Sequence, residues 1–372
     1  MDLLTGYGAS LFGTLVPFLA VLTVVVFFHE LGHFLVARWC GVAVRTFSIG
    51  FGPELFGWND RHGTRWRLAA IPLGGYVKFI DDLNAASAPD RAAAAAAGEG
   101  SFQGKSVARR AAIVAAGPIA NFLLALVIYT LLFASLGKPV VAPIVDAVTP
   151  GSAAAEAGFL PGDRITAIDG RPVDSFTALQ RIVTRSAGLV LTIDVERDGG
   201  HVVLTATPRI DEITDVFGNR QRVGLLGLQR QNGTVVIVHY GPLEAVGQAF
   251  AESADVVGGT LGYIGGIFAG RESADQIGGP IGIAKVSGQA ASLGLIPLVN
   301  LAAVLSISIG LLNLFPIPLL DGGHLVYYAI EAVRGRPLSE RAQDFGFRIG
   351  FAVVLMLMVL GTFNDIVRLV SG

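Results

Sequence analysis

Four long apolar runs, separated by polar stretches, dominate the pattern of hydrophobic and polar positions along the chain. Each run holds about 20 apolar residues, which is enough for a helix to cross the hydrocarbon core of a bilayer. The predicted spans are Leu11–Ala37, Ala111–Leu136, Leu298–Ile330 and Ile349–Val370, and prolines interrupt the third. The pattern therefore predicts a multi-pass α-helical membrane protein with about four transmembrane helices.

Basic residues gather in two of the loops between these spans. The segment 38–110 carries ten Lys and Arg, the loop between the third and fourth spans carries four Arg, and residues 1–10 carry none. Because Lys and Arg are enriched in cytoplasmic loops, we expect both loops in the cytoplasm and both termini outside it.

The chain between the spans predicts β-structure and further domains. Alternating apolar residues and dense glycines in region 42–80 predict a β-hairpin that dips into the membrane, although an ordinary surface hairpin also fits. Residues 81–104 are of low complexity and predict a linker. Short strands, Gly-Asp turns and one helix predict an inserted α+β domain over 140–231, on the side opposite the basic loops. Segment 240–295 begins with an amphipathic helix, which would lie on the membrane surface or pack against the spans.

Composition supports a membrane protein: 52% of residues are hydrophobic and 15% are charged, against roughly 25% charged in a typical globular protein. A formal net charge of −2 offers no support for nucleic acid as a partner. The single cysteine, Cys40, has no second cysteine with which to form an internal disulfide.

The first span contains the motif His29-Glu30-Leu31-Gly32-His33. On a helix, His-Glu-x-x-His places two imidazoles one turn apart on one face, with a carboxylate beside them. That arrangement suits two zinc ligands, His29 and His33, and a general base, Glu30. Ionisable side chains inside a membrane span are costly, so they indicate a functional site.

Zinc needs a third protein ligand, and the third span supplies the strongest candidate, Asp321. Pro316 and Pro318 break the helix before it, and Gly322-Gly323 lets neighbouring backbone approach closely. The alternative is an interfacial aspartate that only caps the next helix.

These motifs resemble those of the site-2 protease family, and most closely its bacterial regulator-of-sigma-E branch. The matching stretches include His29–His33, Gly117–Phe122 and Asn313–Gly323, and the 140–231 insert resembles a circularly permuted bacterial PDZ domain. The best-known members of the branch carry two PDZ domains, whereas this chain has one.

The resemblance implies a zinc-dependent intramembrane endopeptidase of the bacterial cytoplasmic (inner) membrane. Its substrates would be single-span membrane proteins of the anti-sigma-factor type, with His29, His33 and Asp321 as ligands of one zinc ion and Glu30 as catalytic base. The residues implied in substrate contact are Gly50, Phe51, Gly52, Gly74, Gly75, Tyr76, Asn313, Pro316 and Pro318. A peptide C-terminus would bind the PDZ-like domain at Gly224, Leu225, Leu226, Gly227 and Leu228; alternatively, that domain is closed and acts only as a steric block.

Two polar residues of the membrane segments lie outside the implied ligand set. His324 is interpreted as structural, and Asn121 is expected to make an interhelical hydrogen bond, one that would position the site. Two other functions remain open on the residues alone: a catalytically silent membrane scaffold that binds peptides, and a metal transporter.

Overall fold

The computed structural model describes residues 2–81, 98–214, 220–229, 235–270, 273–274 and 277–371. The chain divides into two compact units. The first comprises Met1–Tyr129, Ala249–Thr260 and Ser273–Gly372, and the second comprises Thr130–Gln248 and Leu261–Glu272. The expected linker 81–104 falls largely outside the described residues, which resume at a short 3-10 helix, η1 (Gly98–Gly100).

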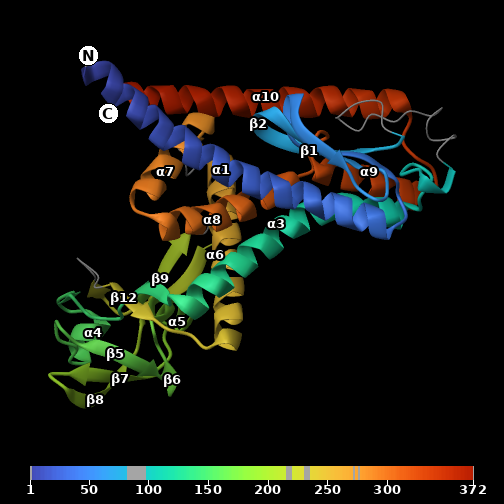
Figure 1. The fold of residues 1–372 in the computed structure, drawn as a ribbon. Helices are drawn as coiled ribbons and strands as arrows, with labels where there is room; N and C mark the ends of the chain where they lie inside the picture. The colour runs from blue at the N-terminus through green and yellow to red at the C-terminus, as the bar shows by residue number, and fades with distance from the viewer. Residues whose placement is uncertain are drawn as a thin grey trace. The chain divides into compact units, whose positions relative to one another are not determined.

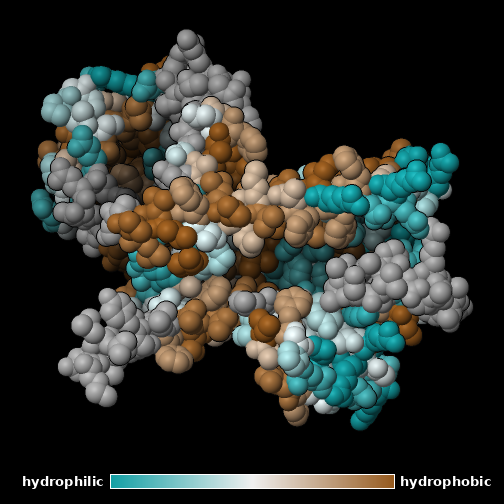
Figure 2. Space-filling view, turned by 90° about the horizontal axis from the view of Figure 1, so that it is seen from above, coloured by the Kyte–Doolittle hydropathy of each residue, from teal (hydrophilic) through white to brown (hydrophobic). Residues whose placement is uncertain are grey.

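Four helices among the described residues are long and apolar enough to cross a membrane: α1 (Asp2–Trp39), α3 (Val107–Ser135), α8 (Leu295–Asn313) and α10 (Glu340–Ser371). Within lipid, only a helix satisfies every backbone N–H and C=O inside one segment, so apolar runs of this length fold in this way. The prediction of about four spans is confirmed. Large apolar side chains of α10, such as Met356, Val359 and Phe363, are more than half exposed, and hydrophobic residues cover much of the surface seen in Figure 2.

The third span is shorter than predicted. Helix α8 ends at Asn313, and residues 314–320 form an irregular turn before α9 (Asp321–Arg334) begins. Pro316 and Pro318 have no N–H to donate and cannot continue the helix, so the predicted end at Ile330 was wrong. Because of this break, Asp321 stands in the first turn of a new helix.

The end of α1 leads directly into a β-hairpin. Gly41 adopts a left-handed φ of +72°, and the Val42 N–H donates to Ala37 O at 2.9 Å, which stops the helix. Strands β1 (Val44–Asn59) and β2 (Arg65–Phe79) then pair antiparallel with several register shifts. Figure 1 shows the hairpin lying along α1.

Aromatic packing fixes the hairpin against the helices of the first unit. Phe34 of α1, Phe47 of β1, Phe79 of β2 and Ile113 of α3 are buried in one cluster, and the Phe47 ring stacks on Trp66 at 4.3 Å between centroids. This packing brings β2 next to the His-Glu-x-x-His turn of α1.

The helical segment predicted over 240–295 forms α6 (Pro242–Phe268) and α7 (Pro280–Ser292). In the first unit, the buried Asp365 of α10 accepts hydrogen bonds from the N–H groups of Gly279 and Gly282 at 3.0 and 2.8 Å. This carboxylate caps the first turn of α7 and ties it to α10.

The second unit contains a four-stranded sheet in the order β6-β5-β7-β8, with helices α4 (Ala153–Glu156) and α5 (Phe176–Arg185) (Figure 1). The strands of this sheet are β5 (Arg164–Ile168), β6 (Arg171–Pro172), β7 (Leu191–Arg197) and β8 (Gly200–Ala206). Smaller pairs join β3 (Lys138–Val141) to β12 (Val235–Val238), β4 (Ala147–Val148) to β11 (Leu228–Gln229), and β9 (Arg209–Thr214) to β10 (Arg220–Leu225). The hydrophobic core of the second unit is centred on Ile165, Ile193 and Val195.

Candidate metal centre

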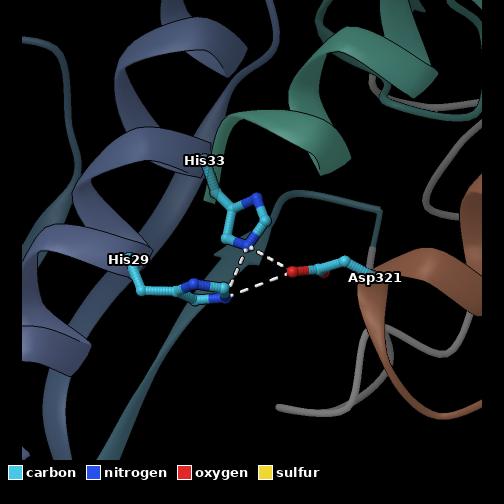
Figure 3. Close-up of side chains that lie close together, drawn as sticks. All are labelled: His29, His33 and Asp321. Atoms are coloured by element: carbon cyan, nitrogen blue, oxygen red, sulfur yellow. Dashed lines mark hydrogen bonds and ion pairs between the residues drawn. The ribbon is translucent and has the colours of Figure 1, made fainter. Parts of the chain in front are cut away.

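His29, His33 and Asp321 converge although Asp321 lies far from the other two in the sequence (Figure 3). The His29 and His33 Nε2 atoms are 3.3 Å apart, and Asp321 Oδ2 lies 3.2 Å from the first and 3.6 Å from the second. Donors held about 2.0–2.1 Å from a tetrahedral zinc ion are separated by roughly 3.4 Å. The spacing and the N, N, O donor set therefore fit zinc. Asp321 Oδ2 is buried, and the ion pairs that it makes with described residues run to the two imidazole Nε2 atoms, so the three donor atoms face one another.

Helix α3 contacts both imidazoles through their Nδ1 atoms. His33 Nδ1 lies 2.9 Å from Ile113 O, to which it can only donate, and this leaves Nε2 to face the donor cluster. His29 Nδ1 lies 3.3 Å from Asn121 Nδ2. The interhelical hydrogen bond expected of Asn121 is thus made to a candidate ligand.

Glycines make the close approaches in this centre. A Cβ on Gly117 of α3 would lie 2.3 Å from His33 Nε2, and one on Gly322 would lie 2.3 Å from the Leu314 and Phe315 carbonyl oxygens. Any side chain at either position would displace a histidine or the turn that carries Asp321.

Glu30 stands beside the three donors and is held by the hairpin. The Val77 N–H of β2 hydrogen-bonds the Glu30 carboxylate, and a Cβ on Gly75 would lie 3.3 Å from Glu30 Cγ. Glu30 and the three donors line a cavity of about 540 Å³. Its walls also include Gly75, Tyr76, Arg110, Leu319, His324, Tyr327 and Glu331.

The residues predicted to contact substrate are distributed unevenly around this cavity. Gly75 and Tyr76 belong to its walls, and the Tyr76 ring stacks on Phe51 at 5.9 Å. Gly74 has a φ of +130° and lies against the Phe51 ring. The other members of the set, Gly50, Gly52, Asn313, Pro316 and Pro318, are not among the described lining residues.

Local contacts explain why two of these residues do not line the cavity. Asn313 Nδ2 donates back to Ile309 O of its own helix at 3.0 Å. Pro318 packs against α10, where a Cβ on Gly350 would lie 2.2 Å from Pro318 O. Their roles in substrate contact stay predictions.

The predicted peptide loop, Gly224–Leu228, lies in the second unit at the end of β10. Leu226 is buried in the core, and the Leu226 and Gly227 carbonyls accept hydrogen bonds from the N–H groups of Ala154 and Thr149. Leu225 is half exposed. Peptide binding at this loop stays a prediction.

An ion pair in the cavity wall was not foreseen from the sequence. Arg110 of α3 donates to Glu331 Oε1 of α9 at 2.7 Å, and both side chains are largely buried. The Arg110 guanidinium also lies 5.0 Å from the centre of the Tyr328 ring. The pair ties the helix that begins with Asp321 to the helix that contacts both histidines.

Comparisons with known proteins identify the family to which this chain belongs. The model of peptidase family M50 matches residues 17–357. A protein of Rhizobium meliloti (strain 1021), whose name assigns it to the zinc metalloproteases, is 53% identical over 359 residues, covering 95% of this chain and 96% of its own. Metalloprotease MmpA of Caulobacter vibrioides is 43% identical, with 95% of each chain covered. Regulator of sigma-E protease of Escherichia coli (strain K12) is 32% identical over 95% of this chain and 98% of its own.

The family acts on membrane proteins within the bilayer, and the relatives and the spanning helices support a multi-pass protein of the inner membrane. Membership in an enzyme family argues against the two alternatives that the residues left open, a catalytically silent scaffold and a metal transporter. The chain belongs to peptidase family M50, the site-2 protease family, and is a zinc metalloprotease.

Proposed function

We propose that this protein is an intramembrane endopeptidase in which His29, His33 and Asp321 hold the zinc ion and Glu30 is the catalytic base. The observation that carries the proposal is the donor cluster, whose three distances of 3.2–3.6 Å suit a tetrahedral ion. The buried Asp321 Oδ2, whose ion pairs run to the two imidazole Nε2 atoms, supports the same assignment.

Peptide hydrolysis needs a polarised carbonyl and a base beside it. When bound, zinc supplies a Lewis acid that polarises the scissile carbonyl and lets water lose a proton near neutral pH. Glu30 accepts that proton on its carboxylate and can return it to the leaving amide nitrogen. The Val77 N–H keeps the carboxylate in place, and residues of β2 and α9 line the cavity around it.

In this proposal, strand β2 holds the substrate in an extended conformation. A transmembrane helix hides its carbonyls in i→i+4 hydrogen bonds, so it must unwind before any carbonyl can be attacked. Segment Gly74–Tyr76 lies beside Glu30 and can offer replacement backbone hydrogen bonds by strand addition. The hairpin packs on α1 next to the His-Glu-x-x-His turn, which supports its association with the membrane.

The substrate class we propose is a single-span membrane protein of the anti-sigma-factor type. Similarity to a protein named regulator of sigma-E protease supports this class. The transmembrane position of His29 and Glu30 also supports it, because the scissile bond must reach the same depth.

We further propose that region 140–231 is one PDZ-like domain outside the cytoplasm, on the same side as both termini. The basic residues of 38–110 support this orientation by the positive-inside rule. The four-stranded sheet with helices α4 and α5 supports the PDZ-like assignment. Such a domain would filter substrates, either by binding a peptide C-terminus at Gly224–Leu228 or by acting as a steric block.

The test is Glu30→Gln in purified protein reconstituted with a single-span model substrate. We expect one zinc per chain, as in the wild type, and loss of detectable cleavage, because glutamine cannot accept the proton. Glu196→Gln, an exposed position on β7, is the matched control and should cleave normally. Unchanged cleavage by Glu30→Gln would refute the assigned base.

The third ligand has its own test. Asp321→Ala should lower the zinc content well below one per chain after dialysis, because it removes the oxygen donor from the cluster. A variant that retains one zinc per chain would show that Asp321 is not a ligand.

A further inference from the structure

A fully buried amide lies beside one candidate zinc ligand. Asn121 of α3 has no exposed surface, its Nδ2 lies 3.3 Å from His29 Nδ1, and its Oδ1 is buried without a hydrogen-bond partner among the described residues. A buried amide is costly inside a membrane span, so its contact with a candidate ligand indicates a role there.

The chemistry of His29 decides which of the two amide atoms should face it. Its Nε2 faces Asp321 and His33, so Nε2 is the atom that would bind zinc. A neutral imidazole that binds metal through Nε2 carries its proton on Nδ1, and that N–H needs an acceptor. The amide oxygen and nitrogen of asparagine are nearly alike in size, so a half-turn about the last side-chain bond brings Oδ1 opposite Nδ1.

We propose that Asn121 is a positioning residue for the metal centre: its Oδ1 accepts a hydrogen bond from His29 Nδ1–H and fixes the tautomer whose Nε2 binds zinc. The inference rests on the proposed ligand set. It makes the two histidines equivalent, because His33 Nδ1 already lies 2.9 Å from Ile113 O. Each imidazole then has one hydrogen-bond acceptor on α3, and the two acceptors, Ile113 O and Asn121 Oδ1, are two helical turns apart.

Helix α8 holds Asn121 from the other side. Ser306 Oγ donates to Asn121 O at 2.8 Å, and a Cβ on Gly310 would lie 3.1 Å from Asn121 Cβ. Since α8 packs this closely, the asparagine backbone cannot withdraw from His29. Helix α8, the third span, therefore contributes to the orientation of His29 through its contacts with Asn121.

The inference is tested by zinc affinity, measured by chelator competition on the detergent-solubilised holoprotein. Asn121→Leu keeps the volume but removes the acceptor, and it should weaken zinc binding by about 10–100-fold. Asn121→Asp restores an acceptor and should bind zinc within a few-fold of the wild type. The control is Asn300→Leu, an exposed position on α8 that should leave affinity unchanged. Wild-type affinity in Asn121→Leu would overturn the proposal.

Two further measurements separate this inference from folding and from the proposed ligand set. In ¹⁵N-histidine-labelled, zinc-loaded wild type, His29 should show a protonated Nδ1, and metal binding through Nδ1 would refute the proposal even if Asn121→Leu fails to fold. His29→Ala should lose tight zinc binding. If it does not, the ligand set is wrong; if it does while Asn121→Leu binds normally, only the role of Asn121 is wrong.

Discussion

Gly117 gives the sharpest prediction about the metal centre, because its place on α3 faces both imidazoles. In Gly117→Ala the new Cβ would lie 2.3 Å from His33 Nε2 and 2.9 Å from His29 Cε1. Ordinary contacts of a Cβ begin near 3.4 Å, so His33 Nε2 would have to move by 3.4 − 2.3 = 1.1 Å.

A movement of this size is incompatible with tight zinc binding. Metal–ligand distances are kept within about 0.2 Å, so the displacement is about five times the tolerance. The His33 ring also cannot retreat from α3 without losing its contact with Ile113 O. We expect zinc binding to weaken by at least about 100-fold, beyond the effect of losing an outer hydrogen bond. We also expect a loss of ~1–3 kcal/mol of stability from overpacking.

The assay is zinc stoichiometry and chelator competition on purified Gly117→Ala. Gly13→Ala is the matched control, because it makes the same change on α1 with no atom within 4 Å of the added Cβ. The control should bind zinc like the wild type. Full zinc content with unchanged affinity in Gly117→Ala would refute the packing argument.

Two more predictions concern ion pairs. Glu331→Gln leaves Arg110 largely buried without its partner carboxylate, so the free energy of unfolding should fall by ~3 kcal/mol. Thermal or denaturant unfolding in detergent measures this change, and an unchanged unfolding midpoint would contradict a stabilising buried ion pair. In the second unit, burial alone would raise the pKa of Asp163, but hydrogen bonds from Arg197 and the Leu160 N–H hold that pKa below its usual value. The folded state therefore binds fewer protons than the unfolded state, and this stabilisation is present above about pH 4 and lost as the pH falls further. Amide exchange of β5 and β7, corrected for intrinsic rates, should show the loss, and Asp163→Asn should abolish this pH dependence.

Hydropathy predicted the spans well because lipid leaves the backbone no alternative to a helix. It failed at the third span, where Leu314–Ile330 remains apolar enough to extend the run. The two prolines predicted a break in the helix, but they did not indicate which residue would begin the next helix. That depends on the tight contacts of Gly322 and Gly323 with the turn before them, which exist only in the folded chain.

The site was predictable to the extent that its chemistry is local. The spacing of His29 and His33 puts both on one helix face, and an aspartate at membrane depth singled out Asp321. The residues of α3 that contact the histidines were harder to predict, because contact between Asn121 and His29 depends on how α3 is rotated and shifted against α1. Arg110 and Glu331, 221 positions apart, carried no pairing signal at all.

The distance along the chain between the donors has a consequence for biosynthesis. His29 and His33 enter the membrane with the first span, but Asp321 is made only after nearly 290 further residues. If His29, His33 and Asp321 are the three ligands, as proposed, a nascent chain that has not yet reached Asp321 carries the His-Glu-x-x-His helix without a complete donor set. The order of synthesis would then keep the proposed centre incomplete until α9 has been made and has folded against α1.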